Sequence, residues 1–242
     1  MSILSSLRRA GPVVALAALI VGCGAPESNG SAESSSNPAG SAEDDVAADR
    51  RVVMFLGTSL TDGYGLEREQ AYPALIQQKI DSAGLPFEVV NAGLSGERSA
   101  GALQRVRGWL LKQPFDVLVI ETGANDMLSG LPVAELRSNI QGIIDTVRAA
   151  KPTARIVLVG MLAAPNLGRT YVERFNGVYP DLAEENDVPL VPFLLEGVAT
   201  ERDLNIADAI HPNEQGHHIL AGTVWKALEP VLRDAGTGQR GG

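Results

Sequence analysis

Short apolar runs alternate with longer segments of helical periodicity along most of this chain, and that alternation restricts the possible folds more than any other feature. The apolar runs predict five strands, over residues 52–56, 87–90, 115–121, 154–159 and 188–191. The longer segments predict helices over residues 67–83, 100–112, 133–150, 168–185 and 213–233. Strands that alternate with helices in this way favour a parallel, doubly wound α/β sheet.

Length and charge narrow the classes of function. Residues 51–235 are expected to form one domain with a full hydrophobic core. The formal net charge of −9 argues against nucleic acid as a partner, and against a basic patch that binds anionic lipid.

Residues with catalytic potential follow the predicted strands. Ser59, Gly96 and Asn125 come after the first, second and third strands, and Asp208 and His211 lie between the last strand and the last helix. The loops at the carboxyl ends of the strands gather at one edge of such a sheet, where ligands usually bind. This convergence supports a common site more strongly than any single motif does.

Ser59 lies in a glycine-rich stretch, residues 55–65, directly after the first strand. Gly57 would let the backbone turn sharply and would place Ser59 at the start of a helix. A serine at that position could simply cap the helix. Together with the other blocks, however, Ser59 is better explained as a nucleophile. The stretch fits neither the dinucleotide-binding nor the P-loop pattern, and the lysine that a P-loop needs does not follow it.

His211 and Asp208, three residues apart, are the predicted general base and the carboxylate that orients it. The alternative is a surface turn whose aspartate and histidine are unrelated. Asp62 lies too close in sequence to the nucleophile to orient His211, so Asp208 is preferred. His217 and His218 lie on the last helix, where we expect them to be surface or partly buried residues. A zinc site of Asp208, His211 and His217 would lack a fourth ligand.

Gly96 and Asn125 are candidate donors to an oxyanion. A glycine lets its backbone N–H approach a developing negative charge, and an asparagine amide can donate without carrying charge. The alternatives are an ordinary turn glycine and an asparagine that hydrogen-bonds to its own loop.

These residues lie in four blocks that resemble those of the GDSL, or SGNH, hydrolase superfamily. The blocks are Gly57-Thr58-Ser59-Leu60, Asn91-x-Gly93-x-Ser95-Gly96, Gly123-Ala124-Asn125-Asp126 and Asp208-x-x-His211-Pro212. The family carries aspartate where this chain has Thr58, and that aspartate is not part of the catalytic machinery. The resemblance implies a flavodoxin-like, three-layer α/β/α sandwich with a central five-stranded parallel sheet.

The resemblance also implies an activity. It implies a serine esterase that cleaves carboxylic esters or thioesters through an acyl-enzyme, without a cofactor or metal. Ser59, Asp208 and His211 would form the catalytic triad. The Ser59 N–H, the Gly96 N–H and the Asn125 amide would form the oxyanion hole.

Three segments, residues 71–75, 166–171 and 188–193, are similar to a branch of bacterial periplasmic arylesterases and acyl thioesterase/lysophospholipases. This similarity implies aryl esters, short to medium acyl esters, lysophospholipids or acyl-CoA as small-molecule substrates. Leu128, Met161 and Leu162 are expected to line the acyl pocket. Two alternatives stay open, a carbohydrate or cell-wall O-deacetylase and a lipoprotein that binds a ligand without catalysis.

The amino-terminal residues predict export. Arg8 and Arg9 precede an apolar run over residues 12–21, so residues 1–22 have the pattern of a secretory signal peptide. The sequence Ile20-Val21-Gly22-Cys23 resembles a bacterial lipobox, which implies cleavage before Cys23 and lipidation of that residue. The alternative is an ordinary cleaved signal with an incidental cysteine. Cys23 is the only cysteine, so the chain has no internal disulfide.

The flanking segments contain few large apolar residues. Residues 23–50 are expected to be a disordered tether, and residues 236–242 a flexible tail. With the signal peptide and the lipobox, the expectation is an exported bacterial lipoprotein that is anchored to a membrane, in the periplasm or at the cell surface. We also expect it to be a monomer.

Overall fold

A five-stranded parallel sheet forms the centre of the computed structural model, which describes residues 50–237. The strands are β1 (Arg51–Gly57), β2 (Phe87–Gly93), β3 (Val117–Glu121), β4 (Arg155–Val159) and β5 (Leu190–Val191). They lie in the order β2-β1-β3-β4-β5, and every neighbouring pair is parallel. The predicted α/β fold is thus confirmed.

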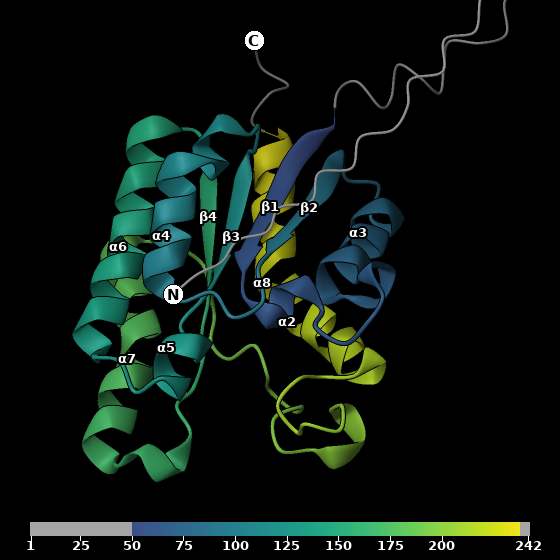
Figure 1. Ribbon diagram of the computed structural model, residues 1–242. Coiled ribbons are helices and arrows are strands. Elements are labelled where there is room, and N and C mark those ends of the chain that lie inside the picture. Colours follow the sequence, from purple (N-terminus) through teal and green to yellow (C-terminus); the bar gives the residue numbers. More distant parts are fainter. Residues whose placement is uncertain (1–49, 238–242) are drawn as a thin grey trace, which may run out of the picture. The chain divides into compact units, whose positions relative to one another are not determined.

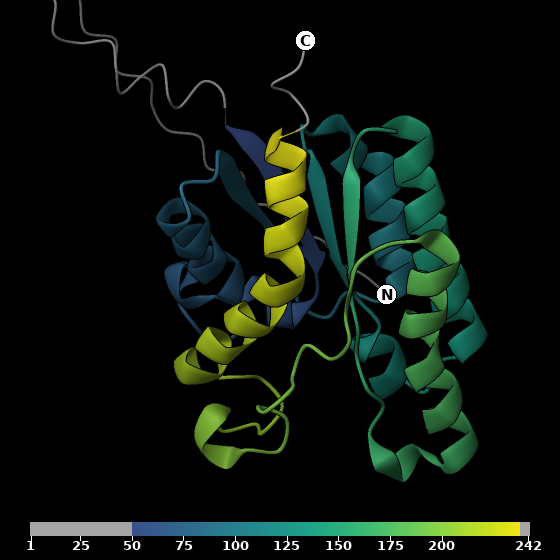
Figure 2. The same ribbon diagram turned by 180° about the vertical axis from the view of Figure 1, so that it is seen from behind.

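Helices cover both faces of the sheet. The α-helices are α2 (Ser59–Asp62), α3 (Tyr72–Ser82), α4 (Ser99–Gly108), α5 (Ala124–Leu128), α6 (Val133–Ala150), α7 (Arg169–Asn186) and α8 (Glu214–Thr237). Short 3-10 helices are η1 (Arg68–Gln70), η2 (Leu110–Lys112), η3 (Pro165–Leu167) and η4 (Arg202–Leu204). In Figure 1, α4 and α6 lie in front of the sheet and α8 lies behind it, and Figure 2 shows α8 crossing the opposite face. The helices and the sheet therefore form three layers.

The hydrophobic core lies between the sheet and these helices. The β3 residues from Val117 to Ile120 are fully buried, as expected for a strand covered on both faces. Helix α6 presents an apolar stripe to the sheet, because its buried residues recur three and four positions apart: Leu136, Ile140, Ile143, Ile144 and Val147.

Several boundaries differ from those predicted. The helix predicted over residues 67–83 is divided into η1 and α3, because Ala71 is extended and Pro73 starts a new helix. Strand β2 continues to Gly93 and β5 shrinks to two residues. Helix α5, which was not predicted, is a five-residue turn directly after β3.

The segments predicted at the amino terminus lie largely outside this part of the chain. The predicted signal peptide, the tether up to residue 49 and the lipidation site Cys23 all precede the described residues. Within residues 50–237, no helix combines the length and apolar character needed to cross a membrane.

Candidate active site

The turn that carries Ser59 lies at the carboxyl end of β1. Strand β1 ends at Gly57, and Ser59 is the first residue of the four-residue helix α2, at the edge of the sheet where α5 also lies (Figure 1). Gly57 is required by packing, since a Cβ there would lie 1.9 Å from Thr61 Oγ1. Gly63 ends the helix with a left-handed φ of 84°.

His211 reaches Ser59 from a loop that lies 152 residues further along the chain. Its Nε2 is 2.9 Å from the Ser59 Oγ, and its Nδ1 is 2.7 Å from the Asp208 Oδ2. A carboxylate only accepts hydrogen bonds, so Nδ1 carries the proton and Nε2 is free to accept the serine hydroxyl proton. The structure thus brings together all three residues that the sequence nominated as a triad.

A compact turn holds Asp208 beside His211. The Asp208 Oδ1 accepts the backbone N–H of Ile210 at 2.9 Å and of His211 at 3.0 Å. These backbone bonds and the bond from the His211 ring lower the pKa of Asp208 to about 2, with the His211 N–H as the largest cause. Ala209, between them, adopts a left-handed φ of 58°. The carboxylate is therefore ionised at neutral pH although it is exposed to solvent.

Gly96 and Asn125 belong to two loops that are joined to each other. The Asn125 side-chain amide donates to the Glu97 carbonyl at 2.9 Å, which uses one of its two N–H groups. Gly96 has a left-handed φ of 80°, so its backbone conformation favours glycine. Its N–H donates to no acceptor among the residues that the structure describes. The arrangement leaves one N–H on each residue available to a ligand.

Ion pairs and hydrogen bonds fasten the Gly96 loop. The Glu97 carboxylate, almost buried, accepts two hydrogen bonds from Arg105, whose guanidinium also donates to the Ala92 carbonyl. On the other side, the Ser95 hydroxyl donates to the Asp62 carboxylate at 2.6 Å. Asp62 therefore binds the loop and not His211, in agreement with the preference for Asp208.

His217 is more deeply buried than expected. Its side chain is 1 % exposed, and its Nδ1 accepts the Tyr72 N–H at 3.0 Å. Burial lowers the pKa of His217 to about 4. Because Nδ1 of the neutral ring accepts this bond, Nε2 carries the proton, and neither nitrogen offers a free lone pair to a zinc ion. Residues 50–237 contain no group of three or more His, Cys, Asp or Glu that could hold a metal.

Two residues near the site were not identified from the sequence. The Tyr64 ring lies over His211, with centroids 4.6 Å apart and planes tilted by 41°. Glu121, at the end of β3, accepts hydrogen bonds from Thr58, which immediately precedes Ser59, and from Thr61 in α2. The sequence does contain an indication of Glu121, because this residue is a carboxylate at the end of an otherwise apolar run. Tyr64 stands between two glycines, which by itself indicates only a turn.

The three residues predicted to line the acyl pocket differ from one another in their exposure to solvent. Leu128 and Leu162 are 62 % and 42 % exposed, in segments that follow β3 and β4. Met161 is 3 % exposed and packs in the hydrophobic core. Only the two leucines are thus presented openly at this edge of the sheet.

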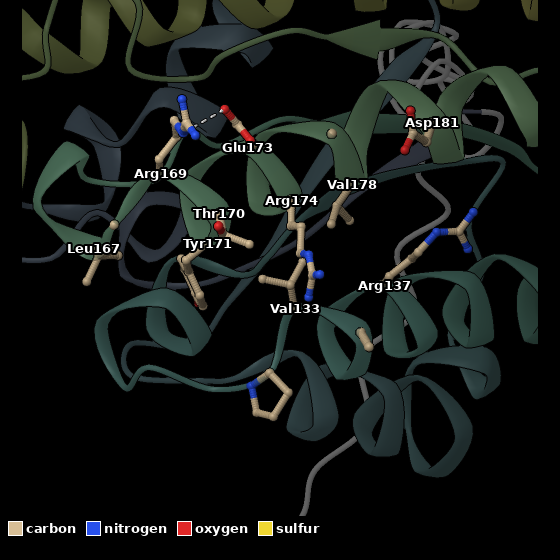
Figure 3. A pocket seen from close by; sticks show the side chains of 14 residues that line it. Val133, Arg137, Leu167, Arg169, Thr170, Tyr171, Glu173, Arg174, Val178 and Asp181 are labelled. Atoms are coloured by element: carbon tan, nitrogen blue, oxygen red, sulfur yellow. Dashed lines mark ion pairs between the residues drawn. The ribbon is translucent and has the colours of Figure 1, made fainter.

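A hollow of about 800 Å³ lies between the amino-terminal parts of α6 and α7 (Figure 3). Val133 and Val178 contribute apolar walls, and Arg174 reaches from α7 toward Val133. Arg137, at its rim, pairs with Glu185. Neither the serine, the histidine nor the aspartate described above lines this hollow, so it is separate from the reactive centre.

Comparisons with known proteins find a family model and several similar chains. The sequence model of the GDSL-like Lipase/Acylhydrolase family matches residues 55–219. The chain is 36 % identical over 182 residues to Esterase TesA of Pseudomonas aeruginosa, which covers 75 % of this chain and 90 % of that protein. It is 34 % identical over 186 residues to Thioesterase 1/protease 1/lysophospholipase L1 of Escherichia coli, covering 77 % and 87 % of the two chains.

A solved structure is also similar. The structure is described as that of AlinE4, a SGNH-hydrolase family esterase, and it superposes with a TM-score of 0.63 at 40 % sequence identity. The match covers 76 % of this chain and 97 % of that one. The similarity therefore extends over nearly the whole of that esterase.

Proposed function

The chain belongs to the GDSL-like lipase/acylhydrolase family, and from this premise we propose that it is a serine esterase that cleaves small-molecule carboxylic esters or thioesters through an acyl-enzyme. The observation that carries the proposal is the hydrogen-bonded series from the Ser59 hydroxyl through the His211 ring to the Asp208 carboxylate. A nucleophile, a base and a group that orients the base are thus in contact before any ligand binds.

In the acylation step, the Ser59 Oγ attacks the carbonyl carbon while its proton moves to the His211 Nε2. The imidazolium that forms is stabilised by Asp208, which stays ionised because its pKa is about 2. The carbonyl π electrons move to oxygen, giving a tetrahedral oxyanion. Collapse of this intermediate expels the alcohol or thiol, which takes the proton from His211.

Three donors are suited to stabilise the oxyanion: the Ser59 N–H, the Gly96 N–H and the second N–H of the Asn125 amide. The first N–H groups of a helix have no intrahelical partner, so the Ser59 N–H at the start of α2 is available. The bond from Asn125 to Glu97 links the other two donors. Preorganised donors of this kind are worth about 10²–10³ in rate each.

Deacylation repeats these steps with water. His211 removes a proton from the water as the water oxygen attacks the acyl carbon, and it then returns the proton to the Ser59 Oγ. The products are a carboxylic acid and free enzyme, so each cycle consumes one ester or thioester and one water.

Apolar side chains exposed at this edge favour an apolar acyl or aryl group over a sugar. Leu128, Leu162 and Ile210 are large and exposed. Leu128 lies three residues after Asn125, Ile210 directly precedes His211, and Leu162 follows β4, which pairs with β3. We therefore propose aryl esters and short to medium acyl esters as substrates, with lysophospholipids or acyl-CoA as natural candidates. The thioesterase and lysophospholipase names of the Escherichia coli relative support this choice.

The test is hydrolysis of p-nitrophenyl esters across acyl lengths by the wild type, Ser59→Ala and Ser82→Ala. Loss of the nucleophile is expected to lower kcat at least about 10³-fold. Ser82 is a matched control, because its exposed hydroxyl donates only within α3. Full turnover by Ser59→Ala would overturn the assignment. Activity confined to acetyl esters of sugars would favour the O-deacetylase alternative.

We further propose that the protein is an exported lipoprotein anchored through Cys23. The proposal rests on the sequence of residues 1–23 alone. Metabolic labelling with a palmitate analogue is expected to mark the wild type and not Cys23→Ser. Equal labelling of both would contradict lipidation at Cys23.

A further inference from the structure

A buried carboxylate contacts the turn that carries the proposed nucleophile. Glu121 is 1 % exposed, and no cation among residues 50–237 forms an ion pair with it. Within the described residues, the hydrogen bonds that its carboxylate accepts all come from the turn that carries Ser59. A buried carboxylate without a counter-ion is costly, so its hydrogen bonds must offset the loss of solvation.

The donors flank Ser59 on both sides along the chain. The Thr58 N–H donates to the Glu121 Oε2 at 2.7 Å, and the Thr58 hydroxyl lies 3.0 Å and 2.9 Å from the two carboxylate oxygens. The Thr61 hydroxyl donates to Oε2 at 2.9 Å. Glu121 therefore binds Thr58, immediately before the serine, and Thr61, the last residue but one of α2.

The α2 helix is also held through Thr61, whose carbonyl accepts the Asn91 amide at 2.8 Å, and through Asp62, whose carboxylate accepts the Ser95 hydroxyl. It is only four residues long, and Thr58, its N-cap residue, makes no side-chain cap hydrogen bond. Its hydroxyl is turned instead toward Glu121. The contact is tight, because a Cβ on Gly57 would lie 2.8 Å from the Glu121 Oε2. The carboxylate of β3 thus takes the place of a local cap for the helix that follows β1.

A second set of contacts extends this anchorage to other helices. The Thr61 hydroxyl is 2.8 Å from the Tyr72 hydroxyl, and the Tyr72 N–H donates to the His217 Nδ1. Tyr72 belongs to α3 and His217 to α8, so α2 is connected to both. The hydrogen bond from the Thr61 hydroxyl to the Glu121 carboxylate connects Glu121 to these contacts.

We propose that Glu121 is a positioning residue for Ser59, which holds the turn from Thr58 to Thr61 so that the serine hydroxyl faces His211. The inference rests on the proposed function, because it takes Ser59 as the nucleophile. Its physical basis is that a displacement of about 1 Å at a reacting group can cost about 10²-fold in rate.

The contact with Glu121 also explains why threonine suits position 58. It stands where the GDSL block has aspartate, and its hydroxyl can donate to Glu121 where an ionised aspartate could not. A second carboxylate about 3 Å from Glu121 would force the pair to share a proton. Burial raises the pKa of Glu121, and the hydrogen bonds from Thr58 and Thr61 oppose that rise. Threonine at position 58 therefore suits a single buried carboxylate.

The test compares Glu121→Gln, Glu121→Ala, Thr58→Val and Thr58→Ser, with Thr122→Val as the matched control. Thr122 is a buried threonine next to Glu121 whose hydroxyl has no hydrogen-bond partner in the described part of the chain, so its replacement removes no bond. For each variant, kcat and KM for a p-nitrophenyl ester are measured together with the rate at which a fluorophosphonate labels Ser59.

We expect Glu121→Ala to lower kcat and the labelling rate about 10²-fold, with KM changed less than about 3-fold. Glu121→Gln is expected to retain kcat within about 5-fold, because an amide oxygen at Oε2 still accepts from Thr58 and Thr61. Thr58→Val is expected to lower kcat about 10-fold, while Thr58→Ser and Thr122→Val keep wild-type values. If Glu121→Ala fails to fold, Thr58→Val decides the outcome.

Wild-type kcat per labelled serine in both Glu121→Ala and Thr58→Val would overturn the proposal. The proposal would also be overturned if Glu121→Gln lost as much kcat as Glu121→Ala and its profile of kcat against pH were shifted on the acid side. That result would show that the charge of Glu121, and not its hydrogen bonds, affects the reaction. The proposed function is judged separately, by the wild type and Ser59→Ala. If the wild type cleaves no ester, hydrogen exchange still decides, because loss of protection at the Thr58 N–H in Glu121→Ala supports the anchorage and unchanged protection contradicts it.

Discussion

Asp208 contacts His211 through both of its carboxylate oxygens, one on the imidazole Nδ1 at 2.7 Å and the other on the backbone N–H at 3.0 Å. The same carboxylate thus shapes the turn and fixes the ring. A loop exposed to solvent can hold a histidine in register with a serine on another element, because the orienting group is only three residues away. Burial of the acid is not needed for this.

Replacing Asp208 by asparagine is expected to lower kcat about 10²-fold with little change in KM. The amide can still accept the backbone N–H groups, but it favours the wrong tautomer of His211. Loss of a buried triad aspartate costs about 10⁴ in kcat, and solvent around this exposed residue reduces the effect. The measurement is ester hydrolysis at neutral pH, with Asp203→Asn, another exposed acid in the same loop region, as the control. Equal activity of both variants would contradict an orienting role.

The ring of Tyr64 is expected to assist His211 in its charged form. An aromatic face near an exposed cation is worth about 0.5–1 kcal/mol, so Tyr64→Ala should lower kcat about 2–5-fold. Tyr64→Phe retains the ring and should stay near the wild-type kcat. The two variants are compared across pH 5 to 9. If phenylalanine is as damaging as alanine, the hydroxyl and not the ring is the contributing group.

Ala209 is predicted to tolerate glycine and to resist a β-branched residue. Its left-handed φ of 58° costs a residue with a Cβ about 1 kcal/mol or more, which glycine does not incur. Ala209→Val should therefore lower the unfolding free energy and displace His211, with a loss of kcat. Urea unfolding and ester hydrolysis are measured beside Ala134→Val, an exposed helical position in α6. Similar losses of kcat at the two positions would show that backbone conformation is not the cause.

His217 is expected to make stability depend on pH in the mildly acidic range. Burial lowers its folded-state pKa to about 4 from 6.5, so the unfolded chain binds a proton that the folded chain does not between those values. Its contribution to stability is complete above pH 6.5 and is lost as the pH falls toward 4. The free energy of unfolding of the wild type is compared with that of His217→Gln by urea titration. Their difference should change between pH 6.5 and 4 and be constant above 6.5; a constant difference throughout would refute the prediction.

The sequence by itself determined the parallel α/β architecture, because the spacing of apolar residues reflects the local geometry of strands and helices. It also indicated which loops share an edge, since every strand of a parallel sheet ends on the same side. The nomination of Ser59, Asp208 and His211 rested on that topology, on the chemistry of the side chains and on the resemblance of four sequence blocks to the GDSL hydrolases. Helix α6, with its regular apolar stripe, has the predicted bounds for the same reason.

Which side chains meet across elements depends on the packing of the folded chain. The contact of Glu121 with Thr58 and Thr61 joins β3 to the turn after β1, and no local pattern reports the distance between two such segments. The placement of Tyr64 over His211 and the burial of Met161 likewise depend on how separate loops pack. Side-chain packing is a property of residues far apart in sequence, whereas periodicity is local; that difference separates what could be predicted here from what had to be observed.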